Sequence, residues 1–205
     1  MSRIPRATRV LASVLLAAGL LALGYAAYVF IDAKAYQAFE QRRFEAARRD
    51  LAVHDAAPEA AAPAPAPTVG GSIGEIRIAR LGLTAMIVEG DSAPILRRAV
   101  GHLAGTALPG EPGNVVLAGH RDTFFRPLRH VRAGDAITLT TLTGEFEYLV
   151  ESTAVVPPSD LQVLEPTGGR TLTLITCFPF AYVGPAPDRF IVRAREAPPR
   201  PRLIG

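Results

Sequence analysis

Three side chains of this sequence have the chemistry that acyl transfer needs: a thiol, an imidazole and a guanidinium. Cys177 is the only cysteine among the 205 residues, and it ends the apolar, β-branched run that begins at Thr171. A lone cysteine has no disulfide partner in its own chain, so it is either a nucleophile or a small buried hydrophobe. A nucleophilic thiol requires a base, and the carbonyl it attacks requires a donor for the developing oxyanion.

His120 is the candidate base. It follows the apolar run 114–119, so it leaves the core at the end of a predicted strand, as Cys177 does. Gly119 beside it could let a substrate backbone approach closely. The other histidines are expected to lie in a stalk or to be structural or solvent-facing: His54, His102 and His130.

Arg189 is the candidate oxyanion donor. It begins an apolar run that extends to Arg193, twelve residues after the thiol. If the two runs are neighbouring antiparallel strands, the first residue of one lies near the last residue of the other. Arg193 shares the same strand face by the period of two and competes for the role, but it lies deeper in the strand.

The N-terminal part predicts a membrane segment. Residues 10–31 carry no charge and are long enough to cross a hydrocarbon core as a helix. Arg3, Arg6 and Arg9 precede them, which favours a cytoplasmic N-terminus and an extracytoplasmic remainder. The alternative is a signal peptide cleaved near 33–35. We favour an uncleaved, single-pass anchor in the cell membrane, because signal peptides have shorter apolar cores of roughly 7–15 residues.

The chain then divides by composition. Residues 32–69 read as a stalk, with a helical part followed by alternating Pro and Ala over 56–67, a segment that cannot form a core and favours an extended spacer. We interpret the stalk as solvated. Residues 70–196 are long enough for one independent core, with 1–9 as a cytoplasmic terminus and 197–205 as a Pro-rich tail.

Composition excludes other functions. Lys and Arg total 22 against 19 Asp and Glu, for a net charge of +3, and the basic residues are scattered. No basic, aromatic-interleaved stripe suggests nucleic acid, and no Cys/His spacing suggests zinc. We therefore expect no nucleic-acid partner, no metal and no cofactor.

The domain is predicted to be mainly β, a barrel or a sandwich with short helices. Thr143-Gly144 is a plausible hairpin turn. Two helical stretches are expected, at 93–100 and 123–131. The expected strands are 74–78, 85–89, 114–119, 135–142, 145–156, 171–176 and 189–194.

These motifs resemble the sortases, cysteine transpeptidases of bacterial surfaces. The resemblance covers about 70–195 and rests on Leu-Ala-Gly-His-Arg-Asp-Thr at 117–123, Thr-Leu-Thr-Leu-Ile-Thr-Cys at 171–177 and Asp-Arg-Phe-Ile-Val at 188–192, which stand in the family's order. Phe-Phe-Arg-Pro-Leu after His120 and Phe-Pro-Phe after Cys177 look most like the class D branch.

The resemblance implies an eight-stranded sortase barrel and a two-step acyl transfer. Cys177 would attack the Thr carbonyl of an LPxTG-like sorting signal at the C-terminus of a surface protein. An amine from a peptidoglycan precursor or a pilin would then release the thioester. His120 would act as general acid and base, and Arg189 would stabilise the oxyanion. The residues implied to line the substrate groove are Ala118, Thr176 and Leu161, the last in a groove wall over 157–170.

Some members of this family bind calcium, but the loop acids here have no site-like spacing: Asp91, Glu111, Asp160 and Glu165. Other extracytoplasmic cysteine transpeptidases or peptidases are the enzyme alternatives. Papain-like peptidases place the cysteine at a helix start before the histidine, and L,D-transpeptidases favour Gly-Cys-x-Arg, which is absent around Cys177. A stalked β-barrel binding module with a buried Cys177 is the non-enzyme alternative.

Overall fold

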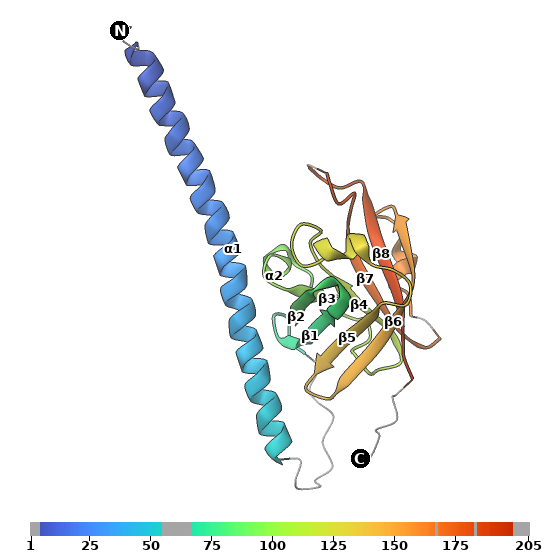
Figure 1. The fold of residues 1–205 in the computed structure, drawn as a ribbon. Helices are drawn as coiled ribbons and strands as arrows, with labels where there is room; N and C mark the ends of the chain where they lie inside the picture. Colours follow the sequence, from blue (N-terminus) through green and yellow to red (C-terminus); the bar gives the residue numbers. More distant parts are fainter. Residues whose placement is uncertain (1–4, 55–66, 167, 183, 199–205) are drawn as a thin grey trace.

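The computed structural model describes residues 5–54, 67–166, 168–182 and 184–198. It consists of one long helix, α1 (Arg6–His54), which runs beside a β-barrel and extends past it at the N-terminal end (Figure 1). The strands are β1 (Ser72–Ile78), β2 (Leu83–Glu89), β3 (Val100–His102), β4 (Gly113–Ala118), β5 (Ala136–Thr141), β6 (Glu145–Val156), β7 (Arg170–Phe178) and β8 (Asp188–Glu196). The short helices are η1 (Ala79–Leu81), α2 (Ala93–Leu96), η2 (Arg126–His130) and η3 (Leu161–Leu164).

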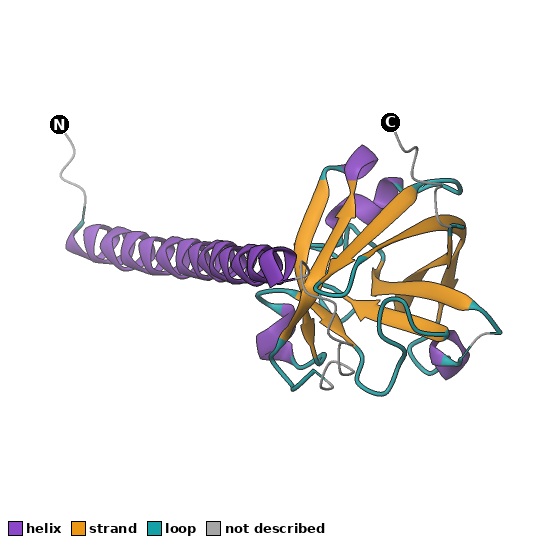
Figure 2. Ribbon diagram, turned by 90° about the horizontal axis from the view of Figure 1, so that it is seen from below, coloured by secondary structure: helices purple, strands orange, loops and turns teal. Residues whose placement is uncertain are grey.

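The strands close into one barrel (Figure 2). Their order around it is β1-β2-β3-β4-β7-β8-β6-β5. Neighbours are antiparallel except for β2 with β3 and β4 with β7, which are parallel. The predicted fold class, mainly β with short helices, is confirmed, and the barrel replaces the sandwich alternative. β3 was missed because its residues fall at the end of a stretch predicted to be helical, of which only Ala93–Leu96 forms α2.

The core fills the barrel with alternating strand residues. In β7, Leu172 and Leu174 belong to the core cluster, and in β8, Val192 and Ala194 do. Truncating a buried leucine of this kind to alanine typically costs about 2–5 kcal/mol. Because side chains alternate along a strand, the odd-numbered residues of β7 and β8 face the outside of the barrel. Cys177 and Arg189 are odd-numbered residues and share this outer face.

The connection between β4 and β5 is tied down by a buried carboxylate. Asp135 accepts two hydrogen bonds from the guanidinium of Arg80 in η1 and one from the backbone N–H of Arg132, at 2.8 Å. These donors hold the pKa of Asp135 below its ordinary value, mainly through the bond from Arg80. Arg80 also donates to the carbonyl of His130 at 2.7 Å, so η1 and η2 are joined.

The second half of α1 packs against the barrel. Gln37 donates to the carbonyl of Arg98 at 2.6 Å, and its side-chain oxygen accepts from the backbone N–H of Met86 in β2 at 2.7 Å. Arg98 also forms a salt bridge with Asp32 at 2.7 Å. Phe44 is buried, with 7% of its surface exposed. The segment read as a solvated stalk therefore contacts the barrel over Asp32 to Phe44.

Among the described residues, α1 is the one helix long and apolar enough to cross a bilayer, by length and composition alone. A signal sequence near the N-terminus meets the same test. Residues 56–66 of the proposed Pro/Ala-rich spacer at 56–67 and residues 199–205 of the tail at 197–205 lie outside the described residues.

Candidate active site

The parallel pairing of β4 with β7 brings His120 beside Cys177. Ala118 lies opposite Ile175 in this register, and two further residues on each strand lead to His120 and Cys177. The pairing continues past the end of β4, because the N–H of Gly119 donates to the carbonyl of Ile175 at 3.1 Å. The two predicted catalytic residues therefore lie next to each other, where two neighbouring strands end. Both are half-buried.

A side-chain contact fixes this strand end. The hydroxyl of Thr176 donates to the carbonyl of Gly119 at 2.7 Å, and Thr176 has only 2% of its surface exposed. A Cβ at Gly119 would lie 2.7 Å from the ring of Phe125, which is fully buried. The ring of Phe125 thus fills the space that a side chain at 119 would need, and the approach of a substrate backbone to Gly119 stays a prediction.

Arg189 lies next to Cys177 on the side opposite to His120, on β8. β7 and β8 are antiparallel, and Cys177 and Arg189 are direct partners in their register. Side chains on directly opposite residues have Cβ atoms roughly 4.5–5.5 Å apart. Nη1 of Arg189 donates to the carbonyls of Ala186, at 3.4 Å, and Asp188, at 3.0 Å. His120 and Arg189 thus flank Cys177 on two neighbouring strands.

Arg193, the competing arginine, lies elsewhere. Its register partner in β7 is Thr173, four residues before Cys177, which corresponds to about 13 Å along the strand. Its guanidinium donates to the carbonyl of Gln162 in η3, at 3.5 Å. Arg193 therefore supports the connection between β6 and β7.

That connection is anchored over the outer face of β4 and β7. The side-chain amide of Asn114, in β4, donates to the carbonyls of Val163 at 3.1 Å and Glu165 at 3.3 Å. Its oxygen accepts from the hydroxyl of Thr173 at 2.7 Å. Asn114 was missed in the sequence because it reads as an ordinary strand residue. These bonds place η3, with Leu161 65% exposed, along the strands that end at the candidate site.

The other side of the site is the connection between β7 and β8, and Arg121 holds it. The Arg121 guanidinium donates to the carbonyls of Pro179 at 3.0 Å, Tyr182 at 2.8 Å and Gly184 at 3.2 Å. It also stacks on the ring of Tyr182, 5.7 Å from its centroid, and is only 7% exposed. Sequence reasoning missed Arg121, because nothing in the sequence shows that the residue after His120 reaches the segment after Cys177.

Three aromatic rings pack together behind the site, with Phe178 and Phe190 on the face of β7 and β8 opposite to Cys177 and Arg189. Phe178 stacks on Phe190 with ring centroids 6.3 Å apart, and Phe180 packs edge-on against Phe190 at 5.2 Å. All three rings are half-buried. Ring pairs of this geometry add about 0.5–1.5 kcal/mol each beyond the area they bury. They stiffen the backbone on both sides of the Cys177–Arg189 pair.

The other candidate residues are placed as follows. Ala118 ends β4 and is half-buried. Thr176, implied to line the groove, has its hydroxyl engaged by Gly119, so any substrate contact through it stays a prediction. His102 is buried and its Nδ1 lies 2.6 Å from Glu89 Oε2, whereas His130 is exposed on η2. His54 is the last residue of α1.

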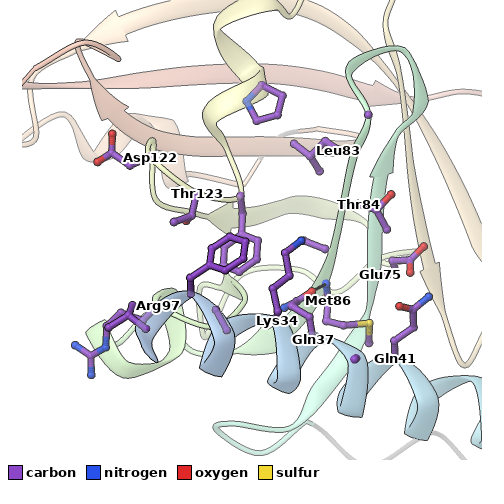
Figure 3. A pocket seen from close by; sticks show the side chains of 18 of the residues that line it. Lys34, Gln37, Gln41, Glu75, Leu83, Thr84, Met86, Arg97, Asp122 and Thr123 are labelled. Atoms are coloured by element: carbon purple, nitrogen blue, oxygen red, sulfur yellow. Dashed lines mark hydrogen bonds between the residues drawn. The ribbon is translucent and has the colours of Figure 1, made fainter. Parts of the chain in front are cut away.

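No group of three or more His, Cys, Asp or Glu side chains in the described ranges could hold a metal ion. A cavity of about 910 Å³ lies between α1 and the barrel (Figure 3). It includes Asp122, Thr123 and Phe124, the residues that follow the His120-Arg121 pair, but not Cys177 itself.

Comparisons with known proteins identify the family. The family model described as "Sortase domain" matches residues 76–197, more than half of the chain. "Sortase D" of Bacillus subtilis is 37% identical over 131 residues, which cover 63% of this chain and 66% of that protein. "Sortase SrtE1" of Streptomyces coelicolor is 35% identical over 149 residues, or 63% of this chain and 42% of that protein.

The chain thus spans between about two fifths and two thirds of the length of these relatives. A solved structure from Clostridium perfringens, described as a Sortase D5 transpeptidase, superposes with a TM-score of 0.67 at 29% identity. The superposition covers 80% of this chain and 99% of that structure. The order of His120, Cys177 and Arg189, the barrel that joins them and these matches agree: the chain belongs to the sortase family.

Proposed function

We propose that the chain is a membrane-anchored sortase that cleaves an LPxTG-like sorting signal and transfers the acyl part to an amine. The observation that carries this proposal is the row of His120, Cys177 and Arg189 across β4, β7 and β8. A thiol with an imidazole on one side and a guanidinium on the other has the base and the oxyanion donor that acyl transfer requires.

In the first step, Sγ of Cys177 bonds to the carbonyl carbon of the Thr residue in the signal, and the thiol proton passes to His120. The tetrahedral intermediate carries its negative charge on the former carbonyl oxygen. The C–N bond then breaks, and His120 returns the proton to the departing amine of the following residue. The products of this step are a Cys177 thioester and a free C-terminal fragment.

In the second step, an acceptor amine attacks the thioester carbonyl and gives a proton to His120. The C–S bond breaks, and the Cys177 thiolate recovers that proton. We propose acceptors in a peptidoglycan precursor or a pilin, and surface proteins with a C-terminal signal as donors. If water attacks the thioester in place of the amine, the thioester is hydrolysed. The proposed enzyme is therefore a transpeptidase, and hydrolysis of the peptide is its side reaction.

Arg189 is assigned to the oxyanion. Its two described hydrogen bonds both leave from Nη1 and end on carbonyls of its own segment. The fork has further N–H donors, and a guanidinium keeps its charge at any physiological pH. The donors that remain can serve the oxyanion and the backbone of the bound peptide.

The peptide is proposed to lie between two connections that the structure anchors independently. One is the η3 side, held by Asn114 and Arg193 and carrying the exposed Leu161. The other is the segment after Cys177, held by Arg121. Ala118 lies on the strand between them, and we propose Ala118, Thr176 and Leu161 as substrate contacts.

We further propose that residues 10–31 of α1 anchor the chain, with 1–9 in the cytoplasm and the catalytic domain, 70–196, outside it. Arg3, Arg6 and Arg9 support this orientation, since basic residues flank spans on the cytoplasmic side. The stretch 32–69 connects the two parts, and its first half also contacts the barrel.

The first test is peptide cleavage by variants of the thiol and the base. Cys177→Ala should abolish cleavage of an LPxTG peptide, because no other cysteine exists. His120→Ala should lower kcat by roughly 10²-fold or more, the range of general acid–base catalysis. His130→Ala, an exposed histidine, is the matched control and should retain wild-type activity. Cleavage by Cys177→Ala, or an equal loss at His130, would contradict the mechanism.

The second test separates the two arginines. Arg189→Ala and Arg189→Lys should each lower kcat by about 10²–10³, the usual loss for one oxyanion donor, since an ammonium does not replace a planar fork. Arg193→Lys should keep most activity, because its contact with Gln162 is remote from the thiol. Transpeptidation rates, with folding checked by circular dichroism, decide this. A deeper loss at Arg193 than at Arg189 would reverse the assignment.

The third test concerns Arg121. A lysine cannot donate to three carbonyls and stack on the ring of Tyr182 at the same time, so the segment after Cys177 should be held less well. Arg121→Lys should therefore lower kcat/KM for the peptide by roughly 10–10²-fold, as expected when a substrate is misplaced. Arg126→Lys, on the exposed face of η2, is the control. Alkylation of Cys177 by iodoacetamide needs no ordered groove and should change little. Full peptide activity in Arg121→Lys, or a parallel loss of alkylation, would rule out a positioning role.

A further inference from the structure

The segment after the catalytic histidine has a three-residue repeat. η2 is a 3₁₀ helix, in which side chains three apart lie on the same face. Phe125 and Leu128 are fully buried, and Val131 packs against the same core. This stripe attaches the segment to the barrel and leaves two other stripes on its surface.

The second stripe is apolar and faces α1. Phe124 and Pro127 line the cavity between the barrel and the helix, and the opposite wall includes Tyr25, Val29 and Phe30. These three residues are in the last third of the proposed membrane span, 10–31. The apolar stripe of the barrel therefore faces the part of α1 that would lie in hydrocarbon.

The third stripe is basic. Arg126 and Arg129 lie three residues apart in η2, Arg132 follows the end of the helix, and all three are exposed. None of them forms a salt bridge with a carboxylate in the part of the chain that the structure describes. The nearest acidic neighbours in sequence are already engaged, Asp135 by Arg80 and Asp122 by Arg121 at 3.6 Å. Arg132 also interacts electrostatically with Asp135, and Arg129 donates to Nε2 of His130 at 3.0 Å, so the positive charge of the stripe is only partly compensated.

The height of the barrel relative to the span is set by contacts. Asp32, the residue after the span, pairs with Arg98, and Gln37 bonds to Met86. The barrel therefore lies beside the last third of the span and the residues that follow it. Figure 1 shows η2 (yellow) in the half of the barrel that is nearer the N-terminal end of α1. In Figure 3, Lys34 projects from α1 into the cavity, one more cation near the end of the span.

We propose that the face made by Arg126, Arg129 and Arg132 with Phe124 and Pro127 docks on the anionic lipid leaflet from which α1 emerges. This proposal rests on the anchoring part of the proposed function. Apolar residues beside a membrane span, flanked by exposed cations that form no salt bridge in the described part of the chain, match the interface of a bilayer with anionic headgroups. His120 lies four residues before Phe124, so docking holds the catalytic end of the barrel at the membrane surface.

The test places a fluorophore on either end of β5. The full chain with Cys177→Ala is labelled at Ala133→Cys, which follows Arg132, or at Leu142→Cys, at the far end of β5, about 20 Å away. Both positions are exposed. The protein is reconstituted in vesicles of phosphatidylcholine, with or without phosphatidylglycerol, that carry a headgroup-linked nitroxide quencher. The Ala133 label should be quenched strongly in the anionic vesicles and the Leu142 label weakly.

Charge reversal is the matched comparison. Arg126→Glu, Arg129→Glu and Arg132→Glu together should abolish the quenching at position 133, since each arginine contributes roughly fivefold to the ratio of docked to undocked protein. Arg42→Glu, Arg48→Glu and Arg49→Glu, exposed on the distal half of α1, change the charge equally and should leave the quenching intact. Equal quenching of the two labels, or insensitivity to the η2 triple, would overturn the docking face.

Two further readouts separate this proposal from the proposed function. Protein that leaves the vesicles in a carbonate wash would overturn the anchoring and the docking face with it, without bearing on the chemistry. Peptide cleavage by the η2 triple with Cys177 present, measured in detergent, should equal wild type. A loss there would show that these arginines act in catalysis, and that outcome would contradict a purely lipid-directed role.

Discussion

The parallel pairing of β4 with β7 is the constraint on which the candidate site depends. The hydrogen bond from Gly119 to Ile175 extends this pairing by one residue beyond β4. The register of the pairing therefore brings His120 to Cys177. The antiparallel pairing of β7 with β8 then adds Arg189 from the other side. A slip of one residue in either pairing would turn a proposed catalytic side chain to the opposite face of the sheet. Buried Thr176 and the ring of Phe125, which leaves no room for a side chain at position 119, oppose such a slip.

Around this row, the barrel positions two connecting segments by different means. Asn114 and Arg193 hold η3 through backbone carbonyls, and Arg121 holds the segment after Cys177 through three more. Asn114 and Arg193 are on strands, and Arg121 lies three residues after the end of β4. The backbone carbonyls of these loops have no partner in a strand, so a side chain that donates to them satisfies their hydrogen bonding. The proposed substrate groove is therefore bordered by loops that the barrel itself orders.

The strand ends could be predicted because each apolar run is bounded by a residue that can take part in acyl transfer. His120 and Cys177 end such runs, and Arg189 begins one. The order in which the strands pair could not, since β4 and β7 are about fifty residues apart in sequence and only the barrel closure joins them. β3 is too short to show a period. Arg121 and Asn114 act over distances that no local pattern reveals. The docking of α1 on β2 was also hidden, because Gln37 and Asp32 look like solvated stalk residues until their partners, Met86 and Arg98, are placed beside them.

The central claim is that Cys177 carries the acyl group between donor and acceptor. The most direct measurement is the intact mass of the enzyme after mixing with an LPxTG peptide in the absence of an amine, followed by peptide mapping of the adduct. The account predicts a mass increase equal to the peptide up to its Thr residue, located on Cys177, and its disappearance when an acceptor amine is added. Turnover of the peptide with no adduct, or an adduct on any other residue, would contradict it.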